Sequence, residues 1–131
     1  TFTGIGIDPH NADGILSDLE SFGCPVIIVT QSCKSLNDPT VDLQLLVKSN
    51  NIEYNKNNEL LTWSFLNASI VRNSFDEIKV DKKPGQKFKR IDPVDACVDA
   101  HTVLLKNRQA EVVDVESELD TYLRSMGWIK D

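Results

Sequence analysis

The chain has 131 residues and a mass of 14.7 kDa, enough for one domain and too little for two ordinary ones. A hydrophobic share of 40% and a charged share of 26% exclude a disordered chain. The longest apolar run, residues 25–29, is far shorter than the roughly 20 residues that cross a bilayer, so we expect no membrane partner. The first residues also lack the basic and apolar regions of a secretory signal.

The three cysteines, Cys24, Cys33 and Cys97, lie far apart in sequence and cannot all pair within one chain. This pattern argues against a disulfide framework or a zinc knuckle and favours a reducing compartment. We expect them to be small buried side chains.

The net charge of −6 is unevenly distributed along the chain. A basic segment at residues 79–90 contains one acid, Asp81, and six bases: Lys79, Lys82, Lys83, Lys87, Lys89 and Arg90. Pro84-Gly85 within it predicts a turn, so the segment reads as a loop. Two interpretations stay open: a solvated surface loop, or a loop that contacts phosphates.

The first thirty residues predict a strand, a helix and a second strand. Residues 2–7 alternate around two glycines, residues 11–22 carry a helical apolar stripe after Asp8-Pro9, and residues 26–30 are a β-branched run. Gly23 is placed to end the helix. We therefore expect a βαβ unit with parallel strands.

The remaining residues alternate between predicted helices and strands, which favours an α/β fold. We expect a helix at 39–48, a hairpin from 52–54 to 60–65, a strand at 75–80, a helix from Asp92-Pro93 to about 106, and a last amphipathic helix at 112–126 that Gly127 ends. Residues 66–71 fit either an extended strand or a short helix.

Two groups of carboxylates are candidate metal ligands. Asp8 lies where a strand ends, the edge at which open α/β sheets bind ligands, although an Asp before Pro is also a good helix N-cap. Asp92, Asp95 and Asp99 fall within about 60° of one another around one helix. A solvated acidic face and a magnesium or manganese site both explain this stripe. Small residues nearby, Ala96 and Ala100, would let that side approach another element, and His101 on the apolar face is expected to be structural.

Five segments stand in a characteristic order: Ile5-Gly-Ile-Asp-Pro-His-Asn-Ala12, Val29-Thr-Gln31, Ser35-Leu36, Leu61-Thr-Trp63 with Asn67, and Lys89-Arg-Ile-Asp-Pro-Val-Asp-Ala96. Together they resemble the C-terminal nuclease domain of phage terminase large subunits. The resemblance runs from about residue 4 to about residue 105.

This resemblance implies an RNase H-like nuclease fold, a mixed sheet with flanking helices, in which acidic residues hold two divalent cations, Mg²⁺ or Mn²⁺, for DNA cleavage. It matches Asp8 to the second acid of the family and Asp92 to the acid that opens the last catalytic helix, with Asp95 as its accessory. Asp99 matches no clear family role. The basic segment would contact the phosphates of the substrate.

The family's first catalytic aspartate and its ATPase motor lie upstream of everything in this sequence. We therefore interpret residues 1–131 as one partial nuclease domain, with a core at 1–106 and a C-terminal helix at 107–131. We expect it to bind metal weakly, to cut poorly alone, and to self-associate through exposed sheet edges.

The leading hypothesis is a metal-dependent DNA endonuclease fragment of a DNA-packaging terminase in the cytoplasm of the bacterial host. Its partners would be double-stranded phage DNA, other terminase subunits and the portal. Two alternatives stay open: a non-catalytic packaging or regulatory module, and another RNase H-like enzyme such as a resolvase or transposase. The leading hypothesis requires Asp8 to lie beside Asp92 and Asp95.

Overall fold

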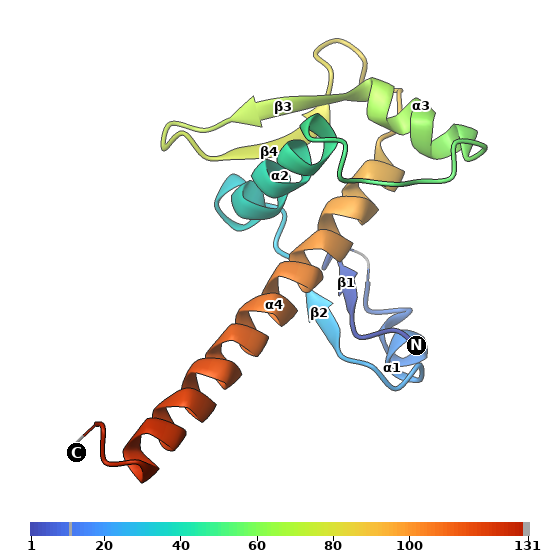
Figure 1. The fold of residues 1–131 in the computed structure, drawn as a ribbon. Helices are drawn as coiled ribbons and strands as arrows, with labels where there is room; N and C mark the ends of the chain where they lie inside the picture. The colour runs from blue at the N-terminus through green and yellow to red at the C-terminus, as the bar shows by residue number, and fades with distance from the viewer. Residues whose placement is uncertain (11, 130–131) are drawn as a thin grey trace.

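The computed structural model describes residues 1–10 and 12–129, apart from the side chains of residues 112–114. The fold is α/β, as predicted, and its strands form two separate two-stranded sheets along one long helix (Figure 1). In chain order the elements are β1 (Ile5–Ile7), α1 (Leu16–Glu20), β2 (Val26–Ile28), α2 (Cys33–Lys48), α3 (Glu59–Asn67), β3 (Ala68–Arg72), β4 (Ile78–Lys82) and α4 (Asp92–Ser125).

The predicted βαβ unit is confirmed by the first sheet. Strands β1 and β2 pair in parallel, with Ile5 opposite Val26 and Ile7 opposite Ile28. Between them α1 is much shorter than the predicted helix at 11–22, of which residue 11 lies outside the described residues. Asp8 is no helix cap, because its Oδ1 accepts a hydrogen bond from the His10 backbone N–H at 2.9 Å in a local turn.

Strand β1 lies unusually close to α4 because two of its residues are glycines. A Cβ at Gly6 would lie 2.6 Å from the Asp99 carbonyl oxygen, and one at Gly4 would lie 2.7 Å from Val103 Cγ1. The acidic side of the helix therefore packs against a strand through the strand glycines, while Ala96 and Ala100 stay exposed. Of the two interpretations left open, a fully solvated acidic face does not hold for Asp99, which is 6% exposed.

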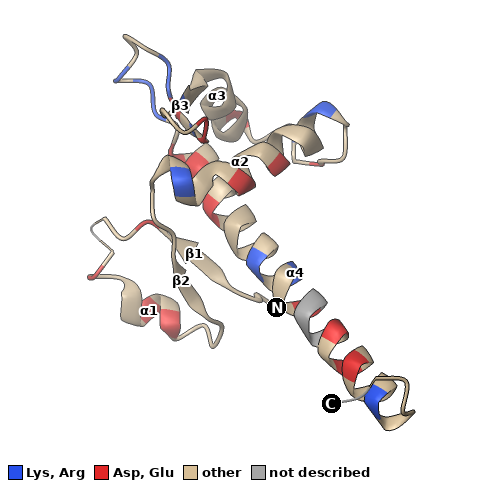
Figure 2. Ribbon diagram, turned by 90° about the vertical axis from the view of Figure 1, so that its left-hand side faces the viewer, with Lys and Arg blue, Asp and Glu red and all other residues tan. Residues whose placement is uncertain are grey.

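Helix α4 is a single helix, so the prediction of separate helices at 92–106 and 112–126 is wrong. The residues between these ranges include neither glycine nor proline, and nothing in them stops a helix. Its N-terminal half packs against β1, α2 and α3, whereas its distal part extends away from both sheets (Figure 1, Figure 2). Gly127, at φ +74°, follows the helix end as predicted.

Helix α2 begins six residues earlier than predicted. The prediction placed Pro39 in the first turn, but the Ser32 side chain caps the helix instead by accepting a hydrogen bond from the Ser35 backbone N–H at 3.2 Å. Pro39 then lies inside the helix, where it lacks a backbone donor.

The predicted hairpin between 52–54 and 60–65 is wrong, because residues 59–67 form helix α3. Asn58 starts this helix by accepting a hydrogen bond from the Leu61 N–H at 3.0 Å. The open choice at 66–71 resolves mainly as strand: β3 follows α3 directly and pairs antiparallel with β4, with Ile70 opposite Val80.

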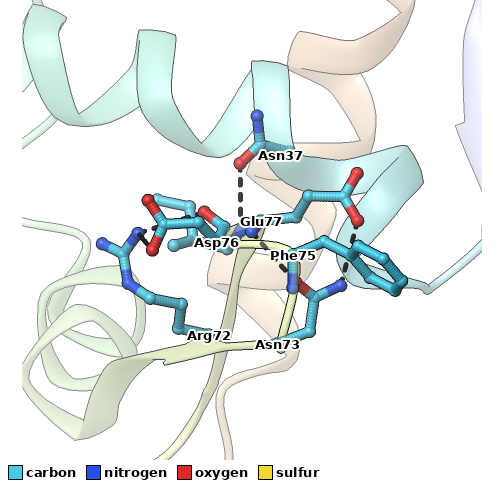
Figure 3. Close-up of polar contacts among 7 residues, drawn as sticks. Asn37, Arg72, Asn73, Phe75, Asp76 and Glu77 are labelled. Atoms are coloured by element: carbon cyan, nitrogen blue, oxygen red, sulfur yellow. Dashed lines mark hydrogen bonds and ion pairs between the residues drawn. The ribbon is translucent and has the colours of Figure 1, made fainter.

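The turn between β3 and β4 is held by side chains. Asn73 Oδ1 accepts hydrogen bonds from the backbone N–H groups of Phe75 and Glu77, both at 3.0 Å, and Arg72 pairs with Asp76 at 2.7 Å (Figure 3). Asn37 Oδ1 on α2 accepts from the Ile78 N–H at 2.9 Å. The second sheet is thereby tied to α2.

The hydrophobic core is small and lies where the two sheets meet α2 and α4. Val29, Leu36, Leu43 and Val98 form its buried centre, and Val80 of β4 packs against them. The three cysteines are free thiols and partly buried. Within the described residues, no helix combines the length and the apolar character needed to cross a membrane.

The close approach of β1 to α4 gives a stability prediction. Gly6→Ala forces a methyl group onto a backbone carbonyl, which we expect to lower the free energy of unfolding by about 1–3 kcal/mol in denaturant titrations. Gly14→Ala is the matched control: its Cβ would meet nothing within 4 Å, so its effect should stay within about 0.5 kcal/mol. Equal effects of the two substitutions would contradict the close contact.

Candidate metal centre and nucleic-acid interface

Asp99 is the carboxylate of α4 that lies nearest to the first sheet, where it interacts with Gln31 and Asp8. Gln31, just after β2, donates from Nε2 to Asp99 Oδ1 at 3.0 Å and to the Val29 carbonyl at 2.9 Å. Burial raises the pKa of Asp99, the Gln31 hydrogen bond lowers it, and the negative charge of Asp8 raises it further. The end of β1 therefore lies within electrostatic reach of the acidic side of α4.

Asp95 is surrounded by other acids. Its pKa rises from 3.8 to about 6, first because the half-buried carboxyl is desolvated, and then because Asp99, Asp92 and Asp81 are negative. Lys79 opposes this shift. We call the five carboxylates the acidic cluster: Asp8, Asp81, Asp92, Asp95 and Asp99.

Lys79 joins the two sheets at this cluster. It lies on β4, and its Nζ donates a hydrogen bond to the Gln31 carbonyl oxygen at 3.1 Å. That carbonyl belongs to the Gln31 backbone, and the Gln31 side chain holds Asp99, so one residue links the first sheet, the second sheet and α4. Lys79 was predicted to contact DNA, and the structure places it beside the carboxylates instead of in the loop that follows.

The predicted ligands are brought together only in part. The negative charges of Asp92 and Asp95 act on each other, and that of Asp8 acts on Asp99. Within residues 1–10 and 12–129, no group of three or more His, Cys, Asp or Glu side chains is arranged so that it could hold a metal ion. The assignment of Asp8, Asp92 and Asp95 as metal ligands therefore stays a prediction.

Sequence reasoning counted Asp99 among the three carboxylates on one helix face but matched it to no family role, and it gave Gln31 no role of its own. The sequence signal that could have found Asp99 is the pair of glycines in β1. Because they lack side chains, they let a helix come close to the strand, and a helix residue at that contact is buried. Gln31 lay inside a segment that carried the family resemblance, but nothing in the sequence indicated its partner, because the bond joins residues 68 positions apart.

The basic loop, defined as residues 82–90 and so including Lys82 at the end of β4, projects from the end of the molecule opposite the distal end of α4 (Figure 2). It carries five basic residues and no acidic one: Lys82, Lys83, Lys87, Lys89 and Arg90. Gly85 adopts φ +75°, which a glycine allows without strain. The loop leads directly into Asp92, the first residue of α4, so the basic charges and the acidic cluster are neighbours.

Asn67 holds both ends of this loop. Its backbone carbonyl accepts a hydrogen bond from the Lys83 N–H at 3.3 Å, and its Nδ2 donates to the Arg90 carbonyl at 3.4 Å. The side chain is 5% exposed at the end of α3. A polar group buried this deeply is retained where it forms hydrogen bonds.

His101 lies outside the acidic cluster. Its Nε2 lies 2.6 Å from Asp42 Oδ2 on α2, and the ring is buried. The pair joins α2 to α4, which agrees with the structural role that the sequence indicated.

Comparison with known proteins decides the family. A family profile described as the terminase large subunit, endonuclease domain, matches residues 2–108. The chain belongs to this family. The match contains the acidic cluster and the basic loop, and the distal part of α4 lies beyond it. Family membership decides against the resolvase and transposase alternative, while the division at residue 106 stays a prediction.

The fold also resembles a solved terminase. The crystal structure of the HK97 bacteriophage large terminase matches 79% of this chain with a TM-score of 0.65 and 20% sequence identity. This likeness supports the RNase H-like fold class. The matched part is only 21% of that chain. A search of curated proteins finds no match.

Asn67→Ala should free the Arg90 end of the basic loop, because only the bond to the Arg90 carbonyl is made by the Asn67 side chain. We expect faster amide hydrogen exchange at residues 83–90 by about tenfold or more, because one of the two hydrogen bonds at the loop base is lost. Asn73→Ala, which loosens the β3–β4 turn, is the control and should leave exchange at 83–90 unchanged. Unchanged exchange in Asn67→Ala would refute its role as the loop anchor.

The raised pKa of Asp95 makes stability depend on pH. The folded state disfavours the ionised carboxylate, so ionisation of Asp95 lowers the free energy of unfolding. This loss is absent below pH 4, grows between pH 4 and 6, and is complete above pH 6. In metal-free buffer at pH 7, Asp95→Asn should raise the free energy of unfolding by about 1 kcal/mol. This value is reduced to allow for solvent screening of the half-exposed side chain. At pH 4 the substitution should change the free energy of unfolding by almost nothing. Asp13→Asn, on an exposed turn, should show no such pH-dependent gain.

Proposed function

We propose that this chain forms part of a metal-dependent DNA endonuclease that belongs to a phage DNA-packaging terminase. The observation that carries the proposal is the acidic cluster around the start of α4 with the basic loop next to it. Lysine and arginine side chains neutralise DNA phosphates, and carboxylates hold the cations that activate water against a phosphodiester. Both kinds of charge then act on one substrate.

The chemistry of the three carboxylates suits a hard divalent cation, although their arrangement in this structure is not that of a formed site. Asp8, Asp92 and Asp95 offer carboxylate oxygens, the ligands that Mg²⁺ and Mn²⁺ prefer. Burial, and after it repulsion by the other carboxylates, raises the pKa of Asp95, and a bound cation would relieve the repulsion. When bound, two such ions supply a metal-activated water and stabilise the leaving oxygen.

The residues around the carboxylates would position them. Gln31 orients Asp99 and is itself held by Lys79, so three elements fix the side of the cluster that faces β1. The basic loop would bind phosphates on either side of the scissile bond, and Asn67 keeps that loop at the start of α4. The family resemblance supplies a further catalytic acid from an earlier strand, so we expect weak metal binding and slow cleavage by this chain alone.

The proposed partners are those that a DNA-packaging terminase would need. They are double-stranded phage DNA, other terminase subunits and the portal, in the cytoplasm of the bacterial host. We also expect the open edges of the β1–β2 sheet to promote self-association of the isolated chain.

The proposal is tested by plasmid nicking with Mg²⁺ or Mn²⁺ in the intact protein that carries this domain. Asp92→Ala should lower the nicking rate by about 100-fold or more, because a ligand of a catalytic ion is lost. The control is Asp38→Ala, a similarly exposed acid on α2, which should nick at the parent rate. Nicking that survives Asp92→Ala unchanged would remove Asp92 from the mechanism.

A non-catalytic packaging module is the second candidate. It is favoured by the lack of a ready three-ligand group among the described residues and by the exposed apolar side chains on distal α4, Val115, Leu119 and Tyr122. Calorimetric titration with Mn²⁺ separates the two: binding that weakens in Asp92→Ala favours the nuclease, and no binding in either protein favours the module.

A further inference from the structure

An aromatic ring stands exposed in the most basic part of the molecule. Phe88 is 78% exposed and lies between Lys87 and Lys89 in the basic loop. Apart from Pro84, the loop offers this ring no other apolar side chain. An exposed ring forgoes the hydrophobic gain of burial, so its position fits a contact made in a complex.

We propose that Phe88 contacts the bases of the bound DNA while the lysines beside it hold the phosphates. This proposal rests on the proposed nuclease function and adds a non-electrostatic contact to it. Aromatic side chains stack on bases in a manner that tolerates any sequence, and apolar wedges enter between base steps of a duplex. Either contact suits a protein that must engage DNA without a base-specific code.

Hydrogen bonds within the loop and at its base fix the backbone that carries Phe88. The base of the loop is closed by the two Asn67 hydrogen bonds, and two further turns close within it: Gln86 N–H to the Lys83 carbonyl at 3.1 Å and Lys89 N–H to the Gln86 carbonyl at 3.0 Å. Phe88 lies within the second of these turns. A loop that is already closed loses less conformational entropy when it binds.

Charge selects DNA as the partner. Phe88 has basic neighbours on both sides, and the loop contains no acid, so a polyanion with flat apolar faces is complementary to it. The loop also runs directly into Asp92, so a polymer bound on the loop passes the acidic cluster. An anionic membrane would attract similar charges, so binding of the same variants to anionic vesicles is measured as the competing outcome.

A second exposed phenylalanine supplies a matched control. Phe75 is 82% exposed in the β3–β4 turn, where its neighbours are the acids Asp76 and Glu77 (Figure 3). It has the same side chain and nearly the same exposure, but the opposite local charge. A general effect of removing surface aromatics would appear at both positions.

The test measures duplex binding by the intact protein in Ca²⁺, over a series of salt concentrations. Phe88→Ala should weaken binding by about 5- to 50-fold, with the slope of log affinity against log salt unchanged, because no charge is removed. Phe88→Tyr should bind like the parent, and Phe75→Ala should have no effect. The double variant Lys87→Ala, Lys89→Ala should weaken binding and lower the slope by about 2.

A spectroscopic readout separates base contact from loop distortion. A duplex with 2-aminopurine near the bound loop should change fluorescence with the parent and with Phe88→Tyr, but much less with Phe88→Ala. Circular dichroism and thermal melting should match the parent for all variants, as expected for exposed positions.

The outcomes distinguish the two proposals. If the lysine variant weakens binding but Phe88→Ala does not, the ring contact is wrong and the nuclease proposal stands. If neither changes DNA binding, the role of the loop in the proposed function also fails. Equal losses in Phe88→Ala and Phe75→Ala, or a loss seen only on anionic vesicles, would overturn the ring contact with DNA.

Discussion

The packing of β1 against α4 determines where every polar group of the candidate site lies. Gly6 brings the strand so near the helix that a single methyl group would collide with the Asp99 carbonyl. The strand ends at Ile7 and Asp8 follows it directly, which places that carboxylate within electrostatic reach of Asp99. Gln31 then fixes the Asp99 side chain from the neighbouring strand. Without glycine in β1, the Asp8 carboxylate would lie farther from the carboxylates of α4.

The local parts of the fold were predictable because local chemistry decides them. The two parallel strands, the glycine after α4 and the opening of a helix at Asp92-Pro93 all follow from residues within a few positions of the element. The same local reasoning failed where two signals competed. At α2 the Ser32 cap prevailed over Pro39 as a helix start, and at α3 the Asn58 cap prevailed over an apolar run that suits a strand.

The candidate site was predictable as a list of charges but not as an arrangement. The stripe of Asp92, Asp95 and Asp99 on one face of α4 follows from helix geometry, since these residues lie three and four positions apart. Their partners do not, because Asp81, Lys79 and Gln31 come from other elements and meet the helix only in the folded chain. Long-range contacts of this kind leave no periodic trace in a single sequence.

The unbroken course of α4 has a mechanical consequence. At 1.5 Å per residue its 34 residues form a rod about 50 Å long. Its proximal turns bear three of the five clustered carboxylates, and its distal turns extend beyond both sheets (Figure 1). A force that tilts the far end therefore turns Asp92, Asp95 and Asp99 as one rigid body against β1 and β4. The helix can act as a lever arm whose short end carries the acids.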